Sequence, residues 1–148
     1  MITQQQVNDH NVEFPSLDDR RVGRPDRYLY AVSAERNGGL IKYDTRSGNS
    51  VSRLLPSAHQ VGEAVFVPAA DTPTVHRVDG MDSMDSMSGA AAEDAGWLIN
   101  IVTPRDGSAS SLLVWDATSL ASGPIATVRL PRRVPAGFHG SWIPEVLR

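Results

Sequence analysis

The chain has 148 residues, of which 41% are hydrophobic, so it can form the packed core of one domain and global disorder is excluded. The net charge of −3 leaves no basic surplus to neutralise phosphates, so we expect no nucleic-acid partner. Cysteine is absent, which excludes disulfides, thiolate metal sites and a cysteine nucleophile. Any metal would therefore be held by histidine, carboxylate or carbonyl groups.

The first ten residues are polar and contain no apolar segment typical of a signal peptide. No apolar run approaches the roughly 20 residues that span a bilayer. We therefore expect a cytoplasmic location.

Short runs rich in Val, Ile, Leu, Tyr and Trp recur along the chain and are separated by Asp, Gly, Ser and Pro, a pattern that predicts an all-β fold. The turn from Asp44 to Asn49 is expected to join two strands as a hairpin, with Gly48 at a positive φ. The expected strands are Arg27–Ala34, Gly39–Asp44, Ser50–Leu54, Glu63–Pro68, Gly96–Thr103, Ser111–Asp116 and Ile125–Leu130.

An internal repeat lies within this pattern. The run Leu40-Ile-Lys-Tyr-Asp44 matches Leu112-Leu-Val-Trp-Asp116, 72 positions further along. Two copies of a unit of about 70 residues, each with three or four strands, are typical of propeller blades, and an antiparallel sandwich is the alternative. Residues 69–94 interrupt the second copy with the low-complexity run Met81-Asp-Ser-Met-Asp-Ser-Met87, which predicts a solvated loop insert.

One histidine has the context of a metal ligand. His139 lies in a stretch dense in Pro, Gly and aromatic residues, and Gly137 and Gly140 beside it allow close backbone approach. The other histidines, His10, His59 and His76, are predicted to be bystanders in tail, loop and insert.

Two glutamates are the other candidates. Glu13 heads Glu-Phe-Pro, and Glu63 begins an apolar strand, where burying a carboxylate is costly unless it has a partner. Each is either an exposed strand-end glutamate or a carboxylate that binds the far nitrogen of a metal-bound imidazole. The chain contains no Gly-rich phosphate loop, no His-Glu-x-x-His and no Gly-x-Ser-x-Gly motif.

The order and spacing of several motifs resemble the C-terminal portion of the carotenoid cleavage oxygenases, the retinal pigment epithelial membrane protein family that includes bacterial apocarotenoid and lignostilbene dioxygenases. The motifs cover nearly the whole chain: Glu13-Phe-Pro15, Arg21–Tyr28, Gly39–Asp44, Glu63–Pro68, Glu93-Asp94, Gly96-Trp97-Leu98, Leu112–Ala117, Val128–Pro131 and Pro135–Gly140 with Trp142 and Pro144.

The resemblance implies that residues 1–148 form about two C-terminal blades of a seven-bladed β-propeller, an incomplete ring. It implies a non-haem Fe(II) on the propeller axis, held by four histidines, where oxygen adds across a conjugated double bond and two carbonyl products are released. His139 matches the last iron ligand and Glu63 the glutamate that orients it. Glu13 matches the glutamate that supports another, upstream ligand. Neutral imidazoles suit Fe(II), and a carboxylate that accepts the Nδ1–H fixes the tautomer.

The implied partners are O₂ and a lipophilic polyene or stilbene, with peripheral membrane contact and self-association through open strand edges. The chain departs from the family pattern in two respects: three iron ligands lie upstream of anything present, and Ala64 stands where the family usually has proline. We therefore expect the isolated chain to be inactive. The alternative to a dioxygenase section is a truncated, catalytically inactive propeller fragment or an interaction module.

Overall fold

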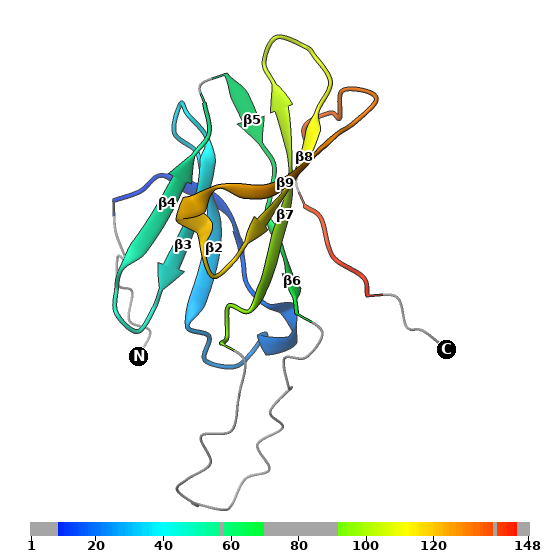
Figure 1. The fold of residues 1–148 in the computed structure, drawn as a ribbon. Coiled ribbons are helices and arrows are strands. Elements are labelled where there is room, and N and C mark those ends of the chain that lie inside the picture. The colour runs from blue at the N-terminus through cyan, green and yellow to red at the C-terminus, as the bar shows by residue number, and fades with distance from the viewer. Residues whose placement is uncertain (1–8, 57, 70–91, 138, 145–148) are drawn as a thin grey trace, which may run out of the picture.

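A computed structural model describes residues 9–56, 58–69, 92–137 and 139–144. Within these ranges the protein consists of antiparallel sheets and two short 3₁₀ helices, η1 (Asp19–Arg21) and η2 (Leu120–Ser122) (Figure 1). The all-β prediction is therefore confirmed. None of the helices in the described part of the chain is long and apolar enough to cross a membrane.

The first sheet, called sheet one, is a meander in which each strand pairs with the next along the chain. Its strands are β1 (Val12–Ser16), β2 (Tyr28–Ser33), β3 (Gly39–Asp44) and β4 (Ser50–Leu54). The predicted hairpin joins β3 to β4, and Gly48 has a φ of +73°. A side-chain oxygen of Asp44 accepts from the backbone N–H of Arg46 at 3.0 Å, which supports the turn.

The second sheet, called sheet two, repeats this plan with a divided first strand. The pieces β5 (His59–Val61) and β6 (Val65–Pro68) both pair with β7, and the order continues through β8 to β9. The remaining strands are β7 (Gly96–Pro104), β8 (Ser111–Asp116) and β9 (Pro124–Arg129). All seven predicted strands are present, although the strand expected from Glu63 begins at Val65. Strands β1 and β5 were not predicted.

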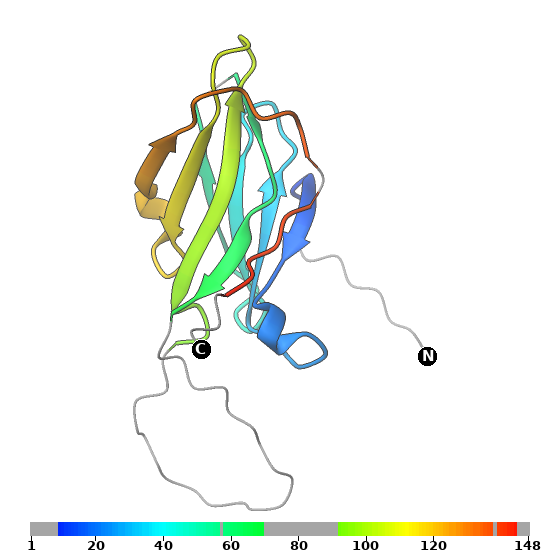
Figure 2. The ribbon, with the colours of Figure 1, turned by 90° about the vertical axis from the view of Figure 1, so that its right-hand side faces the viewer.

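The sheets pack face to face, as the two views show (Figures 1 and 2), and a single apolar cluster fills the space between them. Burial of this apolar surface is the main force that holds the sheets together. The buried members of the cluster are Tyr30, Val32, Leu40, Val61, Ala64, Phe66, Leu98, Val102, Leu113, Trp115, Ala117 and Leu120.

The repeat distinguishes successive blades from a two-fold sandwich. Trp115 in β8 faces sheet one, within the cluster between the sheets. Its repeat equivalent Tyr43 in β3 does not face sheet two but belongs to a separate cluster with Ala31 and Ile41 on the opposite face of sheet one. Equivalent faces thus point in the same direction along the stack, as they do in consecutive propeller blades.

The predicted insert is outside this description for most of its length. Of residues 69–94, the structure describes only 69 and 92–94. The backbone N–H of Ala69 donates to the carbonyl of Ala95 at 3.1 Å, so the two ends of the insert lie together beside β6 and β7.

Candidate metal-site histidine and its glutamates

The first strand of each sheet is interrupted at one of the two glutamates that the sequence indicates as candidate site residues. In sheet one the register of β1 against β2 shifts between Glu13 and Ser16, and Phe14 has a φ of +52°, which is rare for a bulky residue. Pro15 has no N–H to donate, which suits a bulge. Bulges often redirect side chains beside functional sites.

In sheet two the interruption is the gap between β5 and β6, and Glu63 lies in it. The backbone N–H of Gly62 donates to the carbonyl of Ile101 at 2.9 Å, which holds the gap against β7. Asn100 reinforces this contact: its Nδ2 reaches the Gly62 carbonyl at 3.5 Å, and its Oδ1 accepts from the Trp115 indole N–H at 2.9 Å. Glu63 is therefore carried by backbone that is hydrogen-bonded on the core side.

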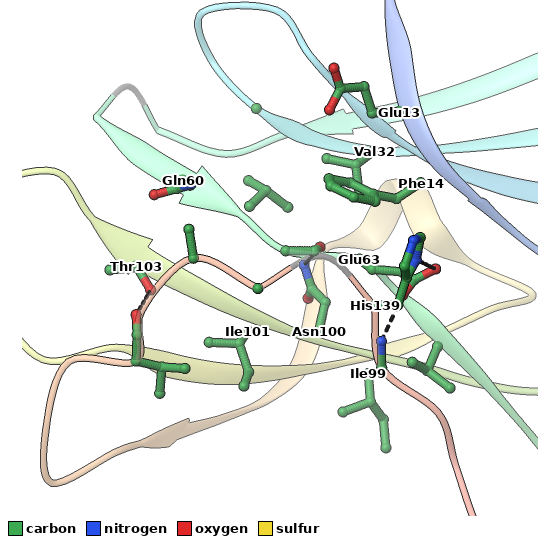
Figure 3. Close-up of a pocket in the computed structure, with 18 of the residues that line it drawn as sticks. Glu13, Phe14, Val32, Gln60, Glu63, Ile99, Asn100, Ile101, Thr103 and His139 are labelled. Atoms are coloured by element: carbon green, nitrogen blue, oxygen red, sulfur yellow. Dashed lines mark hydrogen bonds and ion pairs between the residues drawn. The ribbon is translucent and has the colours of Figure 1, made fainter.

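Glu63 and His139 face each other, although 76 positions separate them in the sequence (Figure 3). The Nδ1 atom of His139 lies 3.4 Å from Oε1 of Glu63, and the Gly140 N–H donates to Oε2 at 2.8 Å. The Glu63 side chain is 14% exposed, whereas that of His139 is 77% exposed. The carboxylate thus binds both the imidazole and the backbone that follows it.

An aromatic ring from sheet one also contacts the imidazole. The Phe14 and His139 rings meet edge to face, with centroids 5.9 Å apart and an interplanar angle of 84°. No residue in the described ranges forms a hydrogen bond with Nε2 of His139. With Nδ1 directed at a carboxylate, Nε2 is the nitrogen that can bind a metal.

These residues line a groove of about 970 Å³ between the first strands of the sheets and the C-terminal segment, which runs past β1 and β6 in Figure 2. Its wall includes Glu13, Glu63 and His139 together with the apolar side chains of Val32 and Ile99 (Figure 3). A mostly apolar groove with few polar groups is typical of a site for an apolar ligand.

Glu13 reaches the same groove without touching His139. Glu13 is exposed, and its side chain forms no hydrogen bond or ion pair with any part of the chain that the structure describes. The structure therefore brings Glu63 and His139 together and leaves Glu13 apart from both.

The remaining histidines do not extend the site. His59 lies in β5, with Nδ1 3.1 Å from the carbonyl oxygen of Pro56, and His10 is exposed. His76 lies outside the described residues. Within residues 9–56, 58–69, 92–137 and 139–144, no three His, Asp or Glu side chains are grouped so that they could hold a metal ion. The chemistry of His139, with Nε2 turned away from its carboxylate partner, fits a single metal ligand, and the described residues do not complete a group of three around it.

The sequence alone did not indicate that Phe14 and Asn100 belong to this region. Phe14 lies within the Glu-Phe-Pro motif, in which the glutamate is the residue with a metal-site signal. Asn100 is a polar residue in an apolar strand, which is a recognisable signal because a buried amide needs partners.

The chain is similar to a known protein family along nearly its whole length. The family model described as "Retinal pigment epithelial membrane protein" matches residues 2–144. The apocarotenoid-15,15'-oxygenase of Synechocystis sp. is 32% identical over 136 residues, which cover 88% of this chain and 24% of that protein. The carotenoid cleavage oxygenase of Mycobacterium tuberculosis is 36% identical over 155 residues, covering 97% of this chain and 26% of that protein.

Solved structures give the same match. The cobalt-substituted Synechocystis ACO superimposes with a TM-score of 0.72 at 30% identity, and an ACO/RPE65 chimera with 0.73 at 28% identity. Each match covers 94% of this chain and 26% of the other. The chain thus spans about a quarter of the length of the relatives that it matches.

Proposed function

This chain belongs to the retinal pigment epithelial membrane protein family, that of the carotenoid cleavage oxygenases, and from that premise we propose that it is the C-terminal section of a non-haem Fe(II) dioxygenase. The fold is that of about two C-terminal blades of the family's seven-bladed propeller. The proposed substrate is a carotenoid, an apocarotenoid or a stilbene, cleaved with O₂ at a conjugated double bond to give carbonyl products.

The contact between Glu63 and His139 carries this proposal. A carboxylate at Nδ1 favours the tautomer with its proton on Nδ1, which leaves the Nε2 lone pair for Fe(II). Because the same carboxylate accepts from the Gly140 N–H, the ring and its backbone are oriented by one group. Iron bound by His139 and three upstream histidines would supply dioxygen activation, with open coordination positions for O₂.

The chain's own residues have four tasks in this scheme. His139 supplies one nitrogen ligand, Glu63 holds its proton at Nδ1, and Glu13 supports an imidazole from outside this chain. The apolar wall of the groove, including Val32 and Ile99, excludes water from an apolar polyene.

The test is iron retention and cleavage activity in the protein as its gene encodes it, including any upstream blades. The Glu63→Gln variant should lose iron retention or activity by about 10–100-fold, because outer partners of metal ligands typically contribute that much. The control is Glu35→Gln, which changes an exposed glutamate at the same groove that has no contact with His139. Equal iron retention and activity in the Glu63→Gln and unsubstituted proteins would remove the proposed role of Glu63.

The 148 residues alone are a separate case. They supply one proposed iron ligand, and the residues that the structure describes hold no group of three. We propose that the isolated chain does not retain Fe(II) and is inactive. Metal analysis of the purified chain decides this: about one iron per chain together with cleavage of a carotenoid or stilbene would contradict it.

A further inference from the structure

The C-terminal segment that carries His139 is fastened to sheet two well before it reaches Glu63. The Leu130 N–H donates to the Ser110 carbonyl at 2.9 Å, and the Ser110 N–H donates to the Arg132 carbonyl at 3.3 Å. The Arg133 guanidinium donates to the Pro104 carbonyl at 2.8 Å. These contacts set the course of the chain where it leaves β9.

The last contacts of this attachment are hydrogen bonds to both the N–H and the carbonyl of Val134. The Val134 N–H donates to Oγ of Ser110 at 2.8 Å, and the hydroxyl of Thr103 donates to the Val134 carbonyl at 3.3 Å. The two hydroxyl oxygens are 2.7 Å apart. One assignment satisfies all three contacts: Ser110 donates to Thr103, and Thr103 donates to Val134. The result is a closed ring of three hydrogen bonds.

Little water reaches the two hydroxyls. Ser110 is 1% exposed and Thr103 is 6% exposed, so the loss of either hydroxyl leaves a backbone group of the partly buried Val134 without its protein partner. Neither hydroxyl is needed by the strand ladder, because β7 and β8 pair through their backbones. The contribution of the two hydroxyls is therefore to hold the C-terminal segment at Val134 and not to hold β7 against β8.

The other end of the segment is held by Glu63, which accepts from the Gly140 N–H. Six residue steps separate Val134 from Gly140, a span of at most about 20 Å when fully extended. His139 lies inside this span, one residue from the second attachment. The position of its ring thus depends on both ends.

We propose that Thr103 and Ser110 are positioning residues for His139. By holding both backbone groups of Val134, they set the start of the span so that the imidazole meets Glu63 with Nε2 free. The importance of this placement for iron rests on the proposed function, whereas the placement itself is a property of the fold.

The experiment uses the protein as its gene encodes it, with amide hydrogen exchange at Gly140 as the first measurement and iron loss to a chelator as the second. Thr103→Val keeps the side-chain shape and removes the hydroxyl, while Thr103→Ser keeps the hydroxyl. Ser110→Ala removes the other partner. Ser122→Ala is the matched control, because it breaks an exposed hydroxyl pair with Ser119 far from the segment.

Thr103→Val and Ser110→Ala should each raise Gly140 exchange and the rate of iron loss by about tenfold, while the amides of β7 and β8 stay protected. Thr103→Ser and Ser122→Ala should match the unsubstituted protein. Should Ser110→Ala fail to fold, the two Thr103 variants carry the comparison.

Three outcomes would overturn the proposal: unchanged Gly140 exchange in Thr103→Val and Ser110→Ala, an equal rise in exchange throughout sheet two, or Thr103→Ser behaving like Thr103→Val. Failure of the proposed function is distinguishable from all three. In that case the unsubstituted protein retains no iron, and the exchange comparison among the variants still decides the positioning role.

Discussion

The ammonium of Lys42 lies 2.5 Å from Oδ2 of Asp94 and 2.7 Å from the carbonyl oxygen of Ala117. Lys42 belongs to β3, whereas Asp94 precedes β7 and Ala117 follows β8. The ammonium also lies 4.3 Å from the centre of the Tyr28 ring. One buried cation therefore joins the two sheets beside their shared apolar cluster.

Substitution Lys42→Met should destabilise the protein by about 3–5 kcal/mol, because it leaves the Asp94 carboxylate buried without its partner. Adding Asp94→Leu should recover part of that loss, since it removes the unpaired charge. Urea unfolding measures both. The control is Arg46→Met: Arg46 pairs with Glu93 but is 70% exposed, so its loss should cost less than about 1 kcal/mol. Equal losses in the two single variants would contradict this assignment.

The loss of folding stability at acid pH should depend on Asp44. Its two oxygens accept from the Arg27 guanidinium at 3.0 and 2.7 Å, and this pairing holds the pKa of Asp44 well below its ordinary value. Stability from this group is present above the unfolded pKa of about 4 and is lost as the pH falls toward the lower folded pKa.

The substitution Asp44→Asn should therefore reduce stability at pH 7 and flatten the decline between about pH 4 and lower values. Unfolding by urea at a series of pH values measures this. An acid decline of unchanged steepness in Asp44→Asn would show that other carboxylates dominate it.

Removing the Trp115 indole N–H should weaken the structure that supports Glu63. In Trp115→Phe the buried Oδ1 of Asn100 loses its donor, and we expect a loss of about 1–3 kcal/mol. Trp97→Phe is the matched control because Trp97 is half-exposed on the opposite face of sheet two, and its effect should stay near 0.5 kcal/mol. Thermal unfolding of the two variants gives the comparison, which fails if their losses are alike.

Phe14 should behave as a residue under backbone strain. Its φ of +52° is costly for any residue with a Cβ and is free for glycine. Both Phe14→Ala and Phe14→Gly lose the ring contact with His139, but only glycine relieves the backbone. Phe14→Gly should therefore be the more stable of the two by about 1 kcal/mol, as measured by urea unfolding. The opposite order would show that the bulge stores no strain.

The strands that sequence reasoning found and those it missed differ in a physical way. Alternating or continuous apolar runs marked β2, β3 and β7, because side chains with period two cover the core face. β1 gives no such signal: its bulge and Pro15 break the alternation. β5 has only three residues, so no period can be read from it. The divided strand around Glu63 is likewise set by contacts with Asn100 and Ile101 that are distant in sequence.

Sequence context selected His139, Glu63 and Glu13 as candidates, and only the family resemblance implied that Glu63 orients His139. No spacing rule by itself brings two residues 76 positions apart into contact. The ring formed by Thr103, Ser110 and Val134 lay beyond prediction for the same reason. Ser110 and Thr103 are common residue types, and only the path of the C-terminal segment gives them partners.

The attachments of the C-terminal segment have a mechanical consequence. Val134 and Gly140 are both bound to sheet two, so His139 and Glu63 move as one body with that blade. Glu13 moves with the other blade, and the Phe14 ring is the contact from that blade to the imidazole among the residues that the structure describes. A slight rotation between the blades would therefore leave the pairing of Glu63 with His139 intact while shifting Glu13 against it.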